Sequence, residues 1–135
     1  MSKIWYPNVQ DIIINNKKVI KIHKETKAER HKILGRYNLQ PIINEAKKTK
    51  GDIFQKASIL LRGINQAHAF ASANKRTAYF TANKFIYKNM NQLVLKKRNK
   101  QKEIAIKVRE GRITDKELTD WLKYPKKNKI YGRKR

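Results

Sequence analysis

Two apolar segments, residues 53–67 and 77–90, enclose the sequence His68-Ala69-Phe70-Ala71-Ser72-Ala73-Asn74-Lys75-Arg76-Thr77-Ala78. Each segment has the length and the spacing of apolar residues that are typical of a buried helix. The small residues around Phe70 favour a loop between the two helices, and residues 74–76 then stand at the start of the second helix. We therefore predict a helix–loop–helix at the centre of the fold.

The residue types at this loop suit an anion, above all a phosphate. The first N–H groups of a helix have no partner within it, and the positive end of the helix dipole lies there. Lys75 and Arg76 add full charges, and a guanidinium can hold a phosphate through two hydrogen bonds. His68 is the natural general base, because an imidazole takes up and releases a proton near neutral pH. Taken singly, His68 would be a core histidine and the two cations a solvated helix start, but their spacing favours transfer chemistry on a nucleotide.

The same residues resemble the signature HxFx(D/N)(G/A)NKRTA of the death-on-curing (Doc) branch of the Fic/Doc, or Fido, superfamily. The matching positions are His68, Phe70, Ala73, Asn74, Lys75, Arg76, Thr77 and Ala78. Lys75 indicates the Doc branch, since Fic adenylyltransferases have glycine at that position. The resemblance covers residues 7–124 and implies an all-α fold, a compact Fido-type helical bundle with a central helix–loop–helix motif.

The resemblance also implies a role for each matched residue. His68 would be the catalytic base. The phosphates of a nucleotide would be held by three residues, Asn74, Lys75 and Arg76, of which the first would also orient the loop. Packing of the motif would rest on Phe70, which pins the loop to the core, and on the small residues Ala73, Thr77 and Ala78.

Ser72 departs from the family in its chemistry. The family has Asp or Asn at this position, and that side chain helps to hold Mg²⁺ on the nucleotide phosphates, so the implied cofactors are ATP and Mg²⁺. A hard divalent cation prefers carboxylate oxygens, and the chain has no Asp or Glu between Asp52 and Glu103. Three interpretations stay open. A distant carboxylate folds back to the loop and Ser72 assists a metal, or a metal is held mainly by the nucleotide phosphates and water, or the metal site is weakened or lost.

The composition suits one compact domain with an anionic partner. The chain has 135 residues, a formal net charge of +24 and no cysteine, which excludes disulfides and thiolate metal sites. No apolar run approaches the roughly 18 residues that span a bilayer, and residues 1–8 lack the apolar core of a signal peptide. We therefore expect a cytoplasmic protein without a membrane partner. The positive charge favours nucleic acid or an acidic protein as its partner.

Further helices are predicted on both sides of the motif. The first would cover residues 9–24, and residues 25–34 would continue or restart it; His23 and His31 should be solvated rather than metal-bound, since a metal site needs several converging ligands. A short helix should follow at 41–48, and Asp52 with Gln55 forms the capping-box pattern that starts the helix of residues 53–67. Related proteins use a flap just ahead of the motif helices to position a target peptide, and residues 47–51 would be part of it.

Beyond the motif the pattern is less regular. The second motif helix should bury Phe80 together with Phe85 and Ile86, and end at Asn89 or Asn91. The remaining elements would be an extended piece at 93–95, an exposed basic loop at 96–102, and helices at 103–109 and 114–122, the last with a capping box of Thr114 and Glu117.

Basic residues gather in the run 96–102 and in the tail 125–135, which follows a Fic/Doc-like domain of residues 1–124. The tail is too polar to form a core, so we expect it to be disordered in the absence of a partner. Candidates for contact with nucleic-acid phosphates are Lys96, Lys97, Arg98, Lys100, Lys126, Lys127, Lys129, Arg133, Lys134 and Arg135. A solubilising tail would have the same composition.

Three functions are compatible with these features. The first is a Doc-like enzyme that transfers phosphate from ATP to a Ser or Thr hydroxyl of a protein such as a translation factor, and acts as a growth-arresting toxin with an antitoxin partner. The second is a catalytically degenerate Fido-fold protein that binds RNA or the ribosome. The third is an adenylyltransferase, which Lys75 disfavours. We expect the first, because the rest of the motif is intact and phosphoryl transfer depends mainly on positioning and charge.

Overall fold

The computed structural model describes residues 3–22 and 26–124, and this part of the chain is built from helices. The six α-helices are α1 (Val9–Ile22), α2 (Gln40–Lys48), α3 (Ile53–Ala67), α4 (Asn74–Met90), α5 (Arg98–Arg109) and α6 (Asp115–Lys123), with a 3-10 turn, η1 (Arg36–Asn38), before α2. Within the described residues the β-structure is a single antiparallel bridge between Ile33 and Phe70. The prediction of an all-α bundle is confirmed.

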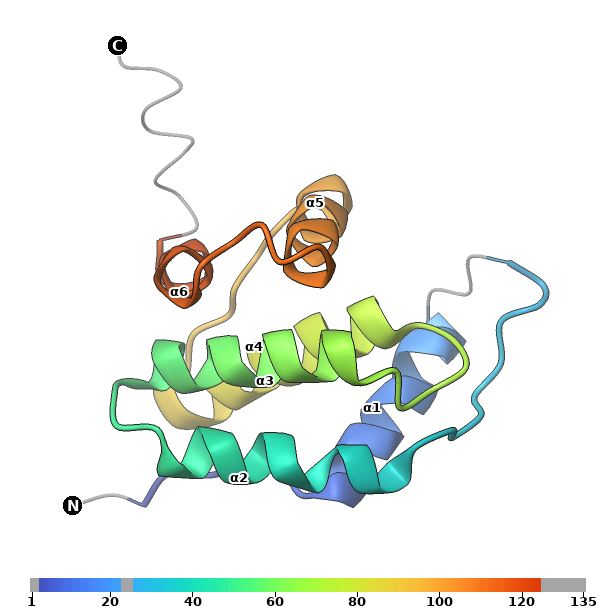
Figure 1. Cartoon of the computed structure of the whole chain (residues 1–135), viewed down its shortest axis with the longest axis horizontal. Coiled ribbons are helices and arrows are strands. Elements are labelled where there is room, and N and C mark those ends of the chain that lie inside the picture. The colour runs from blue at the N-terminus through green and yellow to red at the C-terminus, as the bar shows by residue number, and fades with distance from the viewer. Residues whose placement is uncertain (1–2, 23–25, 125–135) are drawn as a thin grey trace, which may run out of the picture.

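Helix α3 is the centre of the bundle and contacts α2, α4, α5 and α6 (Figure 1). Its sequence explains this position, because apolar residues occur on more than one side of the helix. Leu60 and Ile64 are fully buried, as are Ala57 and the Phe85 side chain that reaches the same core from α4. A helix that is apolar around most of its circumference is stable only when other elements enclose it.

Helices α3 and α6 begin where the capping-box residues predicted their N-termini. The Asp52 side chain accepts a hydrogen bond from the Gln55 N–H, and the Gln55 side chain accepts one from the Asp52 N–H. Thr114 and Glu117 form the same reciprocal pair at α6. The N–H of Thr114 donates to the Glu117 carboxylate and thereby lowers the pKa of that group. Both capping boxes are confirmed.

Gly63 allows α2 to lie directly against α3. A Cβ atom at this position would come within 2.5 Å of Cγ2 of Ile42 on α2, closer than two carbon atoms approach. The absence of a side chain at Gly63 therefore lets the two helices come this close. Lys56, in the first turn of α3, also stabilises the contact between α2 and α3. Its buried ammonium donates hydrogen bonds to the carbonyls of Ala46 and Thr49 at the C-terminal end of α2.

Three local predictions are wrong. Residues 26–34 form no helix, because they extend along the motif loop instead. Helix α5 begins at Arg98, so most of the expected basic loop is helical. Phe80, expected to be buried, is only half-buried. The extended piece expected at 93–95 lies in no helix. Within it Val94 is buried, and its backbone is held by the Asn83 side chain and the Tyr79 hydroxyl.

Two predictions fall outside the described residues: His23 and the basic tail at 125–135, with its candidates Lys126 to Arg135. Among the helices that the structure does describe, none combines the length and apolar character needed to cross a bilayer.

Candidate functional site

The loop between α3 and α4 is held in an unfavourable backbone conformation at both ends. His68, directly after α3, has φ 50° and ψ 43°, and Ala73, directly before α4, has φ 64° and ψ 30°. A side chain in this left-handed region costs about 1–2 kcal/mol, which is why glycine is usual there. Such strain persists only where neighbouring contacts stabilise the loop.

Phe70 and Asn74 hold the loop from inside. Phe70 is 1% exposed, as predicted, and burying such a side chain contributes about 1.5–3 kcal/mol. The Asn74 side chain bridges the loop: its Oδ1 accepts from the Phe70 N–H at 3.2 Å, and its Nδ2 donates to the Phe70 carbonyl at 2.8 Å. The expected loop-orienting role of Asn74 is therefore confirmed, while its role in phosphate binding stays a prediction.

A second segment, residues 32–35, pairs with the loop from outside. The N–H groups of Leu34 and Gly35 donate to the Ala69 carbonyl, and the Ala71 N–H donates to the Lys32 carbonyl. In Figure 1 this segment belongs to the connection between α1 and α2, on the side of the molecule where α3 ends. The loop thus has a backbone partner that the helical prediction for residues 25–34 did not provide.

Asn16 of α1 connects the loop to the core through three hydrogen bonds. Its Nδ2 donates to the Ser72 carbonyl at 2.9 Å and to Thr77 Oγ1 at 3.0 Å, and its Oδ1 accepts from His31 Nδ1 at 2.7 Å. The Thr77 hydroxyl in turn donates to the Ala73 carbonyl. Asn16 is 0% exposed, so the network is shielded from water. The prediction of a solvated His31 is wrong: the ring is partly buried, bonded to Asn16 and close to Phe70.

We expect Ala73→Gly to stabilise the fold by about 0.5–1 kcal/mol, because glycine adopts positive φ without the strain of a side chain. Urea unfolding of the variant should show a higher midpoint with an unchanged slope. Ala78→Gly, at a buried position within α4, is the matched control and should lower the midpoint, since glycine destabilises a helix interior. Equal effects of the two substitutions would contradict the strain at Ala73.

A pocket of about 460 Å³ opens beside the loop. The loop and the first turn of α4 line one side, α5 lines the other, and Asn65 and Glu29 complete the wall. The lining residues are Glu29, Asn65, His68, Ala71, Ser72, Ala73, Asn74, Lys75, Arg76, Lys102, Ile106 and Arg109. All of the predicted chemical residues of the motif therefore face one cavity, of a size typical of small-molecule sites.

His68 and the start of α4 offer this pocket a base and hydrogen-bond donors. His68 is exposed, and within the described residues its imidazole has no hydrogen-bond partner. Helix α4 has no side-chain cap, because its N-cap residue is Ala73. The N–H groups of its first turn are thus not used by a capping side chain. The half-buried Lys75 lies in the same turn and adds a positive charge.

A carboxylate distant in sequence does fold back to the loop. Glu29 lies in the pocket wall, and its Oε2 is 2.5 Å from an Arg76 guanidinium nitrogen. Both side chains are largely buried, with exposed fractions of 13% and 17%. This pairing commits at least part of the carboxylate to a cation rather than to a metal. It also orients Arg76 at the edge of the loop.

The residues at the loop do not fit the Mg²⁺ that the family resemblance implies. Ser72 presents a neutral hydroxyl, which already accepts a long hydrogen bond of 3.4 Å from the Arg30 N–H. Across the described ranges, no three Asp, Glu, His or Cys side chains come together as a metal site would require. Glu29, the carboxylate found among the described residues that line the pocket, is paired with Arg76. A divalent cation held by the protein needs several oxygen ligands, preferably charged ones, and this donor set supplies too few.

The other predicted residues lie in different places. Residues 47–51 precede α3, whereas His68 follows it; fifteen helical residues, about 22 Å, separate them, so the prediction that they act as a flap at the site is wrong. Lys96 lies over the Trp121 ring, Lys97 is the exposed N-cap of α5, and Lys100 pairs with Glu103. Arg98 lines a small hollow that continues from the motif pocket along α5.

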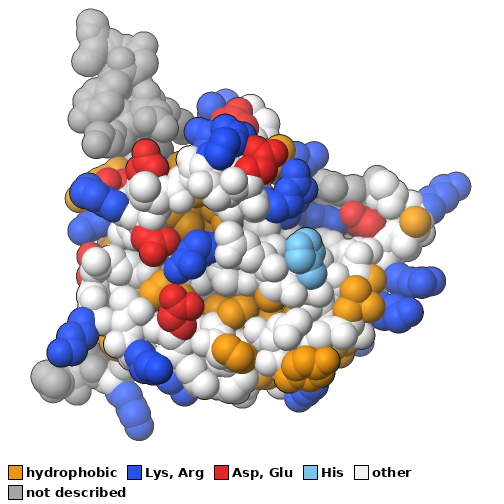
Figure 2. All heavy atoms as spheres, viewed as in Figure 1, with side chains coloured by type: hydrophobic (Ala, Val, Ile, Leu, Met, Phe, Trp, Pro, Cys, Tyr) orange, Lys and Arg blue, Asp and Glu red, His pale blue; other side chains and the backbone are white. Residues whose placement is uncertain are grey.

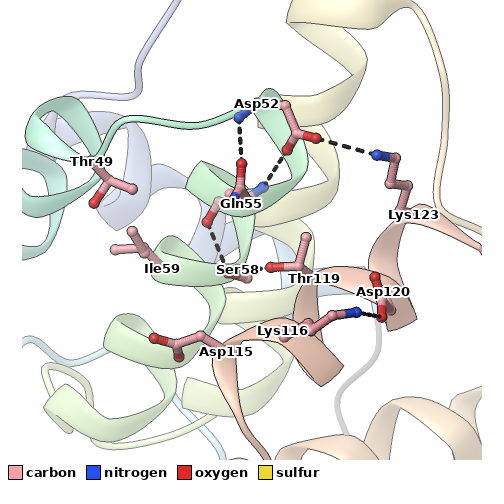
Figure 3. Close-up of a pocket in the computed structure, with 10 residues that line it drawn as sticks. All are labelled: Thr49, Asp52, Gln55, Ser58, Ile59, Asp115, Lys116, Thr119, Asp120 and Lys123. Atoms are coloured by element: carbon pink, nitrogen blue, oxygen red, sulfur yellow. Dashed lines mark hydrogen bonds and ion pairs between the residues drawn. The ribbon is translucent and has the colours of Figure 1, made fainter.

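A further hollow lies at the opposite end of α3, against α6 (Figure 3). Its polar side chains bond to one another: Asp52 to Lys123, Lys116 to Asp120, and Thr119 to Ser58. The hydrogen bond from Lys123 to Asp52 raises the pKa of that lysine. Because these groups pair among themselves, and two of the three pairs join α3 or its N-cap to α6, we interpret this hollow as a structural junction.

Three parts of the site were not predicted: Asn16, Glu29 and the α5 residues Lys102, Ile106 and Arg109. For Asn16 a signal was present, because it lies four residues from both Ile12 and Ile20 and so shares their buried helix face. For Glu29 and α5 no local pattern exists, since only the path of the chain brings them to the loop.

On the face shown in Figure 2, basic side chains lie mainly around the edge of the molecule, with a few acidic side chains among them. The net charge of +24 implies a positive potential over the molecule as a whole.

Comparison with known proteins agrees with the geometry of the loop. A family model described as Fic/DOC family matches residues 15–86, more than half of the chain. The match runs from the Asn15–Asn16 pair of α1 through the motif loop and into α4. No curated protein matches the chain. With its central helix–loop–helix and its matched motif, the chain belongs to the Fic/DOC family.

Proposed function

We propose that this protein is a Doc-branch phosphotransferase, which uses ATP to phosphorylate a Ser or Thr hydroxyl of a protein target. The observation that carries the proposal is the pocket in which His68, Lys75 and Arg76 meet at the uncapped start of α4. Lys75 supports the Doc branch over adenylyl transfer, because a lysine here adds charge where the phosphates would lie.

The proposed reaction assigns each group a role. The hydroxyl oxygen of the target attacks the γ-phosphorus, the bond from that phosphorus to the β–γ bridging oxygen breaks, and ADP leaves. His68 takes the proton of the hydroxyl. Lys75, Arg76 and the first N–H groups of α4 bind and neutralise the phosphate oxygens, which is the main requirement of phosphoryl transfer. Further partners would be a translation factor as target and an antitoxin that restrains a toxin of this kind.

The segment 32–35 is the part of the chain best placed to meet a target. It lies beside the loop, carries the exposed apolar side chains of Ile33 and Leu34, and is followed by the largely exposed Tyr37. Residues 32–35 therefore replace residues 47–51 in our proposal for the flap.

Two radiolabels distinguish the possible reactions. With a purified translation elongation factor as substrate, we expect label from [γ-³²P]ATP on the target and none from [α-³²P]ATP. Label from the α-phosphate only would indicate adenylyl transfer and contradict the proposal. The His68→Gln variant should transfer neither label, which separates activity of this protein from that of a contaminating kinase.

Nucleic-acid binding is a second candidate function, favoured by the basic side chains that continue from Lys75 to Arg98 and Lys102 along α5. Contacts to backbone phosphates release counterions, so RNA affinity should fall steeply as salt rises. Absence of label transfer together with such RNA binding would favour this function over the first.

A further inference from the structure

The charges around the motif pocket are unusual for a site that is expected to hold a metal. Among the described residues that line it, four are cationic, namely Lys75, Arg76, Lys102 and Arg109, and one is a carboxylate, Glu29. With His68 neutral the lining has a formal charge of +3. A divalent cation bound here would be repelled by these side chains, whereas a polyphosphate would be attracted.

Two of these four cations, Lys102 and Arg109, belong to α5, which lies beyond the residues that the family model matches. Lys102 and Arg109 are seven residues apart, so they stand on one face of the helix about 10 Å apart along its axis. Both are exposed, with Ile106 between them in the pocket wall. The two cations therefore bracket the side of the pocket that faces His68 and the start of α4.

The position of α5 is fixed by hydrogen bonds next to the motif. The Asn65 side chain, 3% exposed, donates to the Ala105 carbonyl at 3.2 Å, and the Gln66 side chain donates to the Val108 carbonyl at 3.0 Å. Asn65 and Gln66 belong to the last turn of α3, directly before His68. These two hydrogen bonds hold α5 against the last turn of α3, and α5 in turn places Lys102 and Arg109 beside the motif loop.

From the missing metal ligands and this cationic wall, we infer that the site binds the polyphosphate of a nucleotide without a divalent cation, and that Lys102 and Arg109 of α5 supply the positive charge instead. The inference rests on the proposed function, since it concerns the nucleotide of the same site. Each phosphate of a triphosphate carries negative charge, so cations on both sides of the pocket can neutralise it directly.

Calorimetric titration with ATP tests the inference, in excess EDTA and in millimolar Mg²⁺. The measurement is made at about 0.15 M salt, where distant surface charges are screened. We expect the natural protein to bind one ATP in EDTA, with affinity unchanged or reduced by Mg²⁺, because Mg²⁺ lowers the charge of the nucleotide. Lys102→Gln/Arg109→Gln should weaken binding by about 10- to 100-fold.

The matched control is Lys100→Gln/Lys107→Gln. It removes the same charge from the same helix, at exposed residues outside the pocket lining, and should change affinity by less than about threefold. Ser72→Asp should weaken binding in EDTA and make it depend on Mg²⁺, because it adds the missing carboxylate.

The outcomes separate this inference from the proposed function. Binding that Mg²⁺ strengthens tenfold or more, at the unmodified Ser72, would overturn the inference and leave the phosphotransferase proposal standing. Equal losses in the two double variants would also overturn it, because a general surface charge would then account for the affinity. Absence of any saturable ATP binding, with or without Mg²⁺, would overturn both proposals.

Discussion

Replacing His68 by glycine should abolish phosphate transfer and at the same time stabilise the fold. The transfer rate should fall about 100- to 10,000-fold, the usual contribution of a general base. The free energy of unfolding should rise by about 0.5–1 kcal/mol, because the left-handed conformation at φ 50° suits glycine better than histidine. The measurements are the initial rate of γ-phosphate transfer and urea unfolding.

The control for this experiment is His68→Gln. It keeps a side chain in the strained conformation and a polar group in the pocket, but an amide does not take up a proton. We expect the same loss of transfer with a stability within about 0.5 kcal/mol of the natural protein. A glycine variant that still transfers phosphate would show that His68 is not the base. If the His68→Gly variant were less stable than the natural protein, the exposed histidine would be making a stabilising contact.

Asn16→Ala should have the largest effect on stability, a loss of about 3–5 kcal/mol. The substitution leaves the Ser72 carbonyl, the Thr77 hydroxyl and the His31 ring without their common partner, and each buried polar group so left costs about 1–3 kcal/mol. The loop should also lose its fixed position, and small displacements of catalytic groups reduce rates about 100-fold. Urea unfolding and the transfer rate of the folded fraction measure the two effects.

The neighbouring residue provides a matched control. Asn15 is also buried on α1, but its one described hydrogen bond goes to Thr81 of α4, away from the loop. Asn15→Ala should cost about 1–2 kcal/mol and leave the transfer rate of the folded protein unchanged. Thr77→Val, which removes fewer bonds from the network, gives a milder variant if Asn16→Ala fails to fold. Equal effects on transfer at positions 15 and 16 would contradict the role of Asn16.

Local pattern was sufficient for much of the fold. The capping boxes at Asp52 and Thr114 and the helix 53–67 depend on residues within a few positions of one another. Patterns of this kind act through the same chain segment in almost any context, so they are visible in one sequence.

Segments whose partner is distant were predicted less well. Residues 26–34 were expected to be helical, yet residues 32–35 bond to the loop at Ala69 and Ala71, and this partner outweighs their weak helical preference. The start of α5 was placed too late, because its apolar face becomes apparent only at Ile104. His31 was expected in water, since nothing nearby in sequence indicated that Asn16 would receive it.

The sequence by itself determined the family and the motif, because the motif residues are adjacent in the chain and their spacing alone defines the helix–loop–helix. It also named the residues that we propose offer a base and cations to a phosphate. Only the tertiary structure decided what surrounds them. It paired Glu29 with Arg76, attached the loop to Asn16, and brought Lys102 and Arg109 to the pocket. These contacts join residues up to tens of positions apart, and their energies arise from burial and charge at close range, which no local pattern encodes.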